Sequence, residues 1–176
     1  MTTTYQDPET VSPVLAELLE RIHQRTATVG VIGMGYVGLP LALLFAEREF
    51  PVLGFDVDPT KIETLERGGS YIRHIGVDRV AATFTSGKAQ ATSDFSRLAE
   101  CDAVIVCVPT PLGEHREPDL RYIRMTAETI ARSLRRGQLV VLESTTYPFT
   151  TREELVSRFE TGEMSCGRDF FVAFSP

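Results

Sequence analysis

Three glycines in a GxGxxG spacing constrain the fold of this 176-residue chain more than any other feature. Gly33, Gly35 and Gly38 stand in the stretch VGVIGMGYVGLP, between an apolar run and a segment typical of a helix. In a strand–turn–helix unit the first glycine permits the tight turn, the second lets a diphosphate approach the backbone, and the third lets the helix pack on the strand. The free N–H groups at the helix start would then face the phosphates. The pattern therefore predicts a dinucleotide-binding unit.

The rest of the chain alternates apolar runs of strand length with longer helical patterns. The expected strands are TVGVIG, PVLGFDV, residues 89–92, DAVIVCVP, QLVVLEST and DFFVAFSP. The expected helices are VGLPLALLFAERE, DPTKIETLERGG, PDLRYIRMTAETIARSLRRG with Gly137 as its end, and residues 151–159, with a helical turn near Phe95 and a polar connection at YIRHIG. Strands that alternate with helices pair in parallel through right-handed crossovers. The sequence therefore predicts an α/β fold of the Rossmann type: a doubly wound, mostly parallel sheet with helices on both faces.

A further helix is expected before the first strand. In SPVLAELLERIHQR, Ser12 is the expected N-cap and Pro13 the first helical residue, with apolar side chains along one face. Such a helix packs against its own domain or against a partner subunit. We therefore divide the chain into an N-terminal extension with an amphipathic helix, residues 1–27, and a dinucleotide-binding domain, residues 28–176.

The charge balance argues against two classes of partner. With Lys+Arg 18 against Asp+Glu 24, the net charge of −6 gives no broad attraction for nucleic acid or for an anionic membrane surface. We interpret the basic cluster Arg132, Arg135 and Arg136 as a solvated helix end. The N-terminus lacks the pattern of a signal peptide, and the cysteines have neither metal-ligand nor disulfide spacing. These features predict a cytoplasmic protein without a metal.

An acidic residue after the second expected strand discriminates between cofactors. Asp56 lies in the window expected for the adenine ribose, where a carboxylate accepts hydrogen bonds from the 2′-OH but repels a 2′-phosphate. The stretch FDVDP has no arginine to neutralise such a phosphate, so NAD is favoured over NADP. Lys61, in the first turn of the next helix, either reaches the ribose edge or is an ordinary surface lysine.

Two polar loops follow neighbouring strands. VPTP, residues 108–111, offers a hydroxyl between two prolines, and ESTTYP, residues 143–148, offers hydroxyls and a carboxylate. Hydroxyl-rich loop starts are often only helix caps. Since open α/β sheets bind ligands at the carboxyl ends of their strands, two such loops side by side favour contact with the nicotinamide.

Several ordered motifs together carry a family resemblance. GxGYVGLPLA, GFDVDxxKI, VPTPL…EPDL, ESTTYP…TT and FSP resemble the NAD-binding domain of the UDP-glucose/UDP-mannuronate family of nucleotide-sugar 6-dehydrogenases, from about Thr28 to Pro176. SYIRHI, VPTPLGEHREPDL and LESTTYP are most similar to the bacterial UDP-N-acetylglucosamine 6-dehydrogenase branch. The resemblance implies that NAD takes a hydride from the C6 alcohol of a UDP-sugar, and that a second NAD takes another after a cysteine has captured the aldehyde. The product is a UDP-sugar uronic acid for surface polysaccharide synthesis, made by a homodimer or larger assembly.

The resemblance also assigns roles by position. It implies that the cofactor diphosphate is held by Gly33, Met34, Gly35, Tyr36, Val37 and Gly38, and the adenine ribose by Asp56 and Lys61. On the far side of the sheet, the residues implied to line the cofactor are Val108, Pro109, Thr110, Pro111 and Leu112. The residues implied to approach the nicotinamide are Ser144, Thr145 and Thr146. Thr145 matches the threonine that helps to position the water, and it is the one residue with an implied catalytic role. Glu143 is given no role, and Phe149 stands where relatives commonly carry glycine.

The nucleophilic cysteine of the family has no counterpart in this sequence. None of Cys101, Cys107 and Cys166 stands at its position, and we interpret Cys107 as a buried structural thiol. The resemblance therefore implies a fragment, the cofactor-binding half of the enzyme, that binds NAD without oxidising a UDP-sugar. The alternatives are a stand-alone NAD-binding or regulatory module, and a methyltransferase that uses S-adenosylmethionine, which VPTP and ESTT disfavour.

Overall fold

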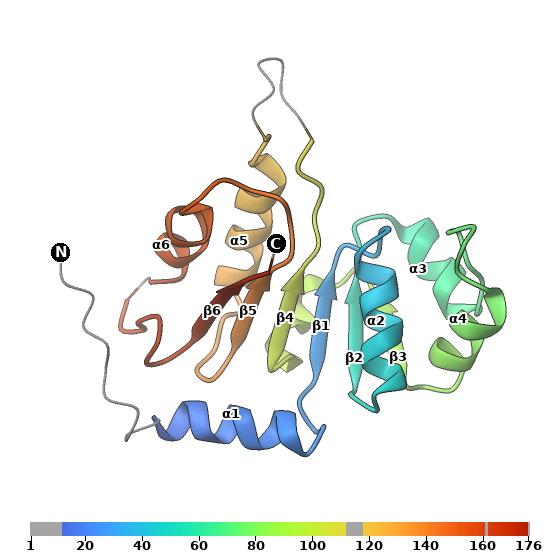
Figure 1. The fold of residues 1–176 in the computed structure, drawn as a ribbon, viewed down its shortest axis with the longest axis horizontal. Coiled ribbons are helices and arrows are strands. Elements are labelled where there is room, and N and C mark those ends of the chain that lie inside the picture. The colour runs from blue at the N-terminus through green and yellow to red at the C-terminus, as the bar shows by residue number, and fades with distance from the viewer. Residues whose placement is uncertain (1–11, 112–117, 161, 176) are drawn as a thin grey trace.

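The sheet is parallel throughout and has the strand order of a doubly wound fold. A computed structural model describes residues 12–111, 118–160 and 162–175, and within these ranges six strands form one sheet in the order β3-β2-β1-β4-β5-β6 (Figure 1). The strands are β1 (Val29–Ile32), β2 (Val52–Phe55), β3 (Ala89–Thr92), β4 (Ala103–Val106), β5 (Leu139–Leu142) and β6 (Phe171–Phe174). All neighbouring strands pair in parallel, in an unbroken register. The predicted Rossmann-type architecture is confirmed.

Helices cover both faces of the sheet, as expected for right-handed crossovers (Figure 1). Alternate residues of β1 point to opposite faces, so that Val29 and Val31 belong to one buried cluster and Ile32 to the other. The first face carries α2 (Gly38–Glu47), α3 (Pro59–Glu66) and α4 (Val77–Phe84); the second carries the 3₁₀ helix η1 (Phe95–Glu100), α5 (Arg121–Ala131), the π-helix η2 (Thr151–Val156) and α6 (Ser157–Phe159).

Two of the sequence predictions for the helices need correction. The polar connection after α3 contains a helix that we did not expect, α4, whose Val80 and Phe84 lie four residues apart and are buried against α2 and α3. The helix predicted to end at Gly137 ends instead at Ala131, and Gly137 takes a φ of 82° two residues before β5. Both differences reflect tertiary packing, which selects among short helical patterns of similar propensity.

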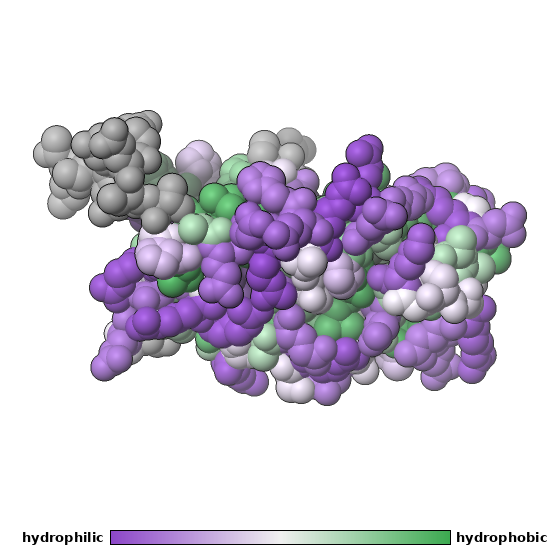
Figure 2. All heavy atoms as spheres, turned by 90° about the horizontal axis from the view of Figure 1, so that it is seen from below, coloured by the Kyte–Doolittle hydropathy of each residue, from purple (hydrophilic) through white to green (hydrophobic). Residues whose placement is uncertain are grey.

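The N-terminal helix α1 (Pro13–His23) forms as predicted, with the Ser12 side chain accepting a hydrogen bond from the Leu15 N–H at 3.2 Å. It lies across the amino ends of the strands (Figure 1), and the face of the molecule on that side is largely hydrophilic (Figure 2). None of the helices in the described ranges is long and apolar enough to cross a membrane.

A buried carboxylate joins α1 to the sheet. Asp102, just before β4, accepts hydrogen bonds from Arg21 of α1 at 2.7 Å, from Arg135 at 2.7 Å and from the backbone N–H of Thr28 at 2.8 Å. Arg135 also donates to the carbonyl oxygens of Ala99 and Cys101, both at 2.8 Å. The interpretation of the basic cluster as a solvated helix end is therefore wrong for Arg135. This side chain binds the segment that precedes β4, including the buried Asp102.

Replacing Asp102 by alanine should lower the free energy of unfolding by about 3 kcal/mol, because two arginines and a backbone N–H would lose a shared acceptor. Urea denaturation followed by circular dichroism measures the change. The control is Glu63→Ala, which removes an exposed ion pair with Arg67 and should cost about 0.5 kcal/mol or less. Similar losses in the two variants would contradict a special role for Asp102.

Candidate functional site

The carboxyl ends of four strands open into a single pocket of about 880 Å³. Gly33 after β1, Asp56 after β2, Val108 after β4 and Ser144 after β5 all line it. Strands β2 and β3 lie on one side of β1, and strands β4, β5 and β6 lie on the other. The strand order therefore reverses between β1 and β4, beside the pocket. Open α/β sheets bind ligands at such a point, and this volume suits a ligand of dinucleotide size.

The three glycines of the first loop have three different surroundings. Gly33 has a φ of 90°, and a Cβ there would lie 2.5 Å from the carbonyl oxygen of Cys107. A Cβ on Gly38 would lie 1.9 Å from the Gly33 carbonyl oxygen, so no other residue allows α2 to start so close to β1. A Cβ on Gly35 would meet nothing within 4 Å, and Gly35 lines the pocket. The first and third glycines thus permit the turn and the packing, and the second leaves open space where a ligand can reach the backbone.

The start of α2 offers backbone donors beside that space. Ser12 and Asp58 cap α1 and α3 with their side chains, whereas the N-cap of α2, Val37, makes no side-chain cap bond. Tyr36 and Val37 are exposed and line the pocket. The first-turn N–H groups of a helix without a cap, together with the positive end of its dipole, form an anion-binding position.

Asp56 lines the pocket at the end of β2, and its side chain is almost buried, at 5% exposure. Its carboxylate accepts hydrogen bonds from the Met34 N–H at 2.9 Å, from the Asp58 N–H at 3.0 Å and from the Lys61 ammonium at 2.9 Å. A carboxylate has about four acceptor positions, so one remains for a ligand hydroxyl. Lys61 is therefore an ion-pair partner at the pocket and not an ordinary surface lysine.

Met34 occupies a different place from its neighbours in the glycine loop. Its side chain is fully buried in the core cluster that includes residues of α2. A Cβ on Gly54 would lie 2.7 Å from its sulfur, so the side chain packs closely against β2. The side chain therefore makes no contribution to the pocket wall. Its backbone N–H, which binds Asp56, instead connects the glycine loop to the end of β2.

The two polar loops also reach the pocket. The residues at positions proposed from the sequence that line it are Gly33, Gly35, Tyr36, Val37, Asp56, Lys61, Val108, Pro109, Thr110, Ser144 and Thr145. Ser144 donates to the Val108 carbonyl oxygen at 2.8 Å and so links the loops after β4 and β5. Gly38, Pro111 and Thr146 do not line the pocket, and Leu112 lies outside the described residues. The Thr146 hydroxyl is buried and has no hydrogen-bond partner within the described ranges.

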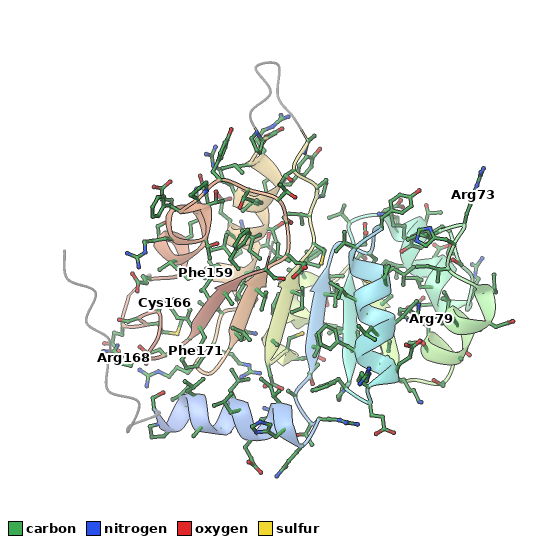
Figure 3. The ribbon with its side chains drawn as sticks, in the orientation of Figure 1. Arg73, Arg79, Phe159, Cys166, Arg168 and Phe171 are labelled. Atoms are coloured by element: carbon green, nitrogen blue, oxygen red, sulfur yellow. The ribbon has the colours of Figure 1, made fainter. Side chains whose placement is uncertain are left out.

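One cysteine differs from its predicted environment. Cys107, expected to be a buried structural thiol, is only partly buried and lines the pocket, whereas Cys101 is fully buried against Gly30. Burial, with a smaller contribution from Glu143, raises the pKa of the Cys107 thiol to about 12. Burial likewise raises the pKa of Cys101 to about 12, and also that of Cys166, which lies near Phe171 at the β6 edge of the sheet (Figure 3). All three thiols are therefore protonated at neutral pH.

Sequence reasoning missed one wall of the pocket. Four residues of α5 line it: Tyr122, Met125, Thr126 and Thr129. They lie three, four and seven positions apart, which is the spacing of one helix face, on the side away from the buried Ile123, Ala127 and Ile130. This second stripe was visible in the sequence, but a mixed apolar and hydroxyl face of a helix has no spacing that distinguishes it from a solvated surface.

Phe149 adopts the conformation that the resemblance led us to question. Its φ is 74°, and it stands third in a turn closed by a hydrogen bond from the Thr150 N–H to the Tyr147 carbonyl oxygen at 3.3 Å. A positive φ at this position favours glycine, the residue that the family resemblance implies there. The phenyl ring is 75% exposed, so packing offsets little of the backbone strain.

Two alanine substitutions in the glycine turn test its packing role separately from its role in ligand access. Gly38→Ala should lower the free energy of unfolding by about 3 kcal/mol or more, because its methyl group would overlap the Gly33 carbonyl oxygen. Gly35→Ala should change the same quantity by less than about 1 kcal/mol, since its methyl group meets open space. Urea denaturation of the two variants measures both values. A loss as large for Gly35→Ala as for Gly38→Ala would mean that the space over Gly35 is already filled.

The pocket thus combines an anion position, a carboxylate for a hydroxyl, an apolar helix face and a hydroxyl-rich loop. In the part of the chain that the structure describes, no group of three or more His, Cys, Asp or Glu residues could hold a metal ion. These features suit a long, flexible ligand with an anionic centre and a ribose on one side of it.

Comparison with known proteins agrees with this geometry. Residues 27–176 match the NAD binding domain of the UDP-glucose/GDP-mannose dehydrogenase family. The UDP-N-acetyl-D-glucosamine 6-dehydrogenase of Pseudomonas aeruginosa is 36% identical over 84% of this chain and 34% of its own length. The UDP-N-acetyl-D-mannosamine dehydrogenase of Escherichia coli K12 is 40% identical over 68% of this chain and 28% of its own.

A solved structure gives the same result. The NDP-N-acetyl-D-galactosaminuronic acid dehydrogenase of Methanosarcina mazei Go1 superposes with a TM-score of 0.81 at 33% sequence identity, over 94% of this chain and 37% of that one. The chain therefore spans about a third of the length of the relatives that it matches. Because the family match covers the whole sheet and every loop of the pocket, the chain belongs to the UDP-glucose/GDP-mannose dehydrogenase family, of which it is the NAD binding domain.

Proposed function

We propose that NAD lies across the pocket with its diphosphate over the start of α2 and its adenine ribose at Asp56. The single observation that carries this proposal is the open space over Gly35, between two glycines whose neighbours leave no room for a Cβ. Gly33, Gly35, Tyr36, Val37 and Gly38 form the turn and the helix start that hold the diphosphate. The residues present therefore fit the cofactor.

The two ends of the pocket suit the two ends of the cofactor. The exposed side chain of Val57, with Met125 of α5, offers apolar contact for the adenine ring beyond Asp56. On the other side of the strand-order reversal, Thr110 and Thr145 offer hydroxyls near the nicotinamide. NAD supplies a hydride acceptor there. The chain itself binds and orients the ring, and we assign to Thr145 the positioning of a water molecule.

Asp56 also supports a preference for NAD over NADP. Three of its acceptor positions are occupied by protein donors, and the last can accept the 2′-OH of a ribose. A 2′-phosphate at the same place would face a nearly buried carboxylate. The neighbouring Lys61 is already paired with that carboxylate, so it neutralises Asp56 rather than a phosphate.

We further propose that the whole enzyme oxidises a UDP-N-acetylhexosamine, with UDP-N-acetylglucosamine as the first candidate, to its uronic acid for surface polysaccharide synthesis. Relatives named for N-acetylglucosamine and for N-acetylmannosamine support the substrate class. The motifs SYIRHI and LESTTYP support the choice of glucosamine within it. We also propose that the enzyme acts in the cytoplasm as a homodimer or a larger assembly.

Asp56→Asn should weaken NAD binding by about 10- to 100-fold, because a hydrogen bond to a charged acceptor is lost. It should also reduce the preference for NAD over NADP. Isothermal titration calorimetry of the 176-residue chain with both dinucleotides measures the two effects. The control is Asp58→Asn, which makes the same change at an exposed helix cap and should alter affinity by about twofold or less, because only screened charge is removed. Equal affinity of the unmodified chain for NAD and NADP would overturn the assignment of Asp56.

The 176-residue chain should bind NAD but produce no NADH with UDP-N-acetylglucosamine. The raised pKa values of Cys101, Cys107 and Cys166 leave no thiolate to capture an aldehyde at neutral pH. Without that capture the first hydride transfer stays reversible and the second cannot follow, so NADH does not accumulate. NADH absorbance in the presence of both compounds tests this expectation. Steady turnover by the purified chain would show that its own residues suffice for catalysis.

A further inference from the structure

The connection between α3 and α4, residues 67–76, lies against the glycine turn although none of its residues lines the pocket. Ile72 and Ile75 are buried in the same cluster as Met34, at 3% and 5% exposure. The Ile72 N–H donates to the Ser70 hydroxyl oxygen at 3.3 Å, and that hydroxyl donates to the Ile72 carbonyl oxygen at 3.1 Å. Its own packing and hydrogen bonds therefore order this connection.

Two aromatic side chains of the connection contact the glycine turn. The Tyr71 hydroxyl donates a hydrogen bond to the carbonyl oxygen of Met34 at 2.5 Å. The ring of His74 stacks on that of Tyr36, with centroids 6.1 Å apart and 22° between the planes. Burial, followed by the carboxylates of Asp56 and Asp58, raises the pKa of the Tyr71 phenol well above its usual value. The phenol therefore stays protonated, as a donor must.

The Tyr71 contact bears on the direction of a neighbouring N–H group. Met34 is already held by the bond from its N–H to Asp56 and by its buried side chain. The Met34 carbonyl and the Gly35 N–H belong to one planar trans peptide and point in opposite directions. When Tyr71 binds the carbonyl, it therefore aims the Gly35 N–H away from the connection. Gly35 lines the pocket at the position where the diphosphate is proposed to lie.

We propose that Tyr71 and His74 are positioning residues for the cofactor diphosphate. Tyr71 sets the orientation of the peptide that carries the Gly35 N–H. His74 fixes the position of the Tyr36 ring, next to Gly35, by stacking on it. Together they keep the glycine turn in its binding shape before the ligand arrives, which reduces the entropy lost on binding. This inference rests on the proposed cofactor site, and it adds a part of the chain that does not touch the ligand.

The test compares ligands that carry the diphosphate with one that lacks it. Tyr71→Phe should weaken binding of NAD and ADP-ribose by about fivefold, the equivalent of one neutral hydrogen bond. It should leave the affinity for adenosine unchanged, because adenosine does not contact the glycine turn. His74→Ala should weaken the two diphosphate ligands by about two- to fivefold, and His74→Phe should restore them because stacking returns. Calorimetry for NAD and ADP-ribose and NMR titration for adenosine provide the dissociation constants.

The matched control is Arg73→Ala, between the two positions. Arg73 is exposed and extends outward from the connection (Figure 3), so this variant should bind all three ligands as the unmodified chain does at 0.15 M salt. A role in stability alone predicts lower melting temperatures with equal affinities among the folded molecules. Affinities unchanged in Tyr71→Phe, or reduced as much for adenosine as for ADP-ribose, would overturn the inference.

The NAD affinities of the unmodified chain and of Asp56→Asn distinguish a failure of this inference from a failure of the proposed function. If the unmodified chain failed to bind NAD, the proposed cofactor site would be wrong, and the inference would fall with it. If the unmodified chain bound NAD and Asp56→Asn weakened it while Tyr71→Phe and His74→Ala did not, the site would stand and the inference alone would be wrong.

Discussion

The close contact between Gly38 and the Gly33 carbonyl oxygen determines where α2 begins relative to β1. A Cβ at position 38 would lie 1.9 Å from that oxygen, so the helix can reach this position only with glycine. Because α2 starts directly over the end of β1, its uncapped first turn faces the crevice between the two halves of the sheet. The open space over Gly35 follows from the same turn. The anion position is thus a consequence of backbone packing, and the side chains around it add selectivity.

Two carboxylates secure β1 at its opposite ends. Asp56, at the end of β2, accepts from the Met34 N–H just after β1, and Asp102, before β4, accepts from the Thr28 N–H just before β1. Each is nearly buried, and each also binds cationic side chains, Lys61 in one case and two arginines in the other. The first carboxylate keeps an acceptor position facing the pocket. The second is bound by arginines, one of which joins α1 to the sheet. Similar chemistry therefore serves the proposed cofactor site at one end and stability at the other.

The site could be predicted where it depends on backbone geometry and could not where it depends on side chains from distant elements. The glycine turn, Asp56 and the loops containing Thr110 and Thr145 follow strand ends, and all parallel strands end at one edge of the sheet. The α5 wall was missed because its direction depends on how that helix crosses the sheet. Arg135 was misinterpreted for a related reason, since its partner, Asp102, lies 33 residues earlier in the chain.

The sequence by itself determined the alternation of strands and helices, the glycine turn and the acidic residue of the proposed cofactor position. These depend on local periodicity, on the steric limits of single residues and on the fixed geometry of a βαβ unit. The tertiary structure alone decided that α4 forms, that Cys101 is fully buried while Cys107 reaches the pocket, and that Tyr71 contacts Met34. Such outcomes depend on which surfaces meet when distant segments pack, and local sequence carries little information about those contacts.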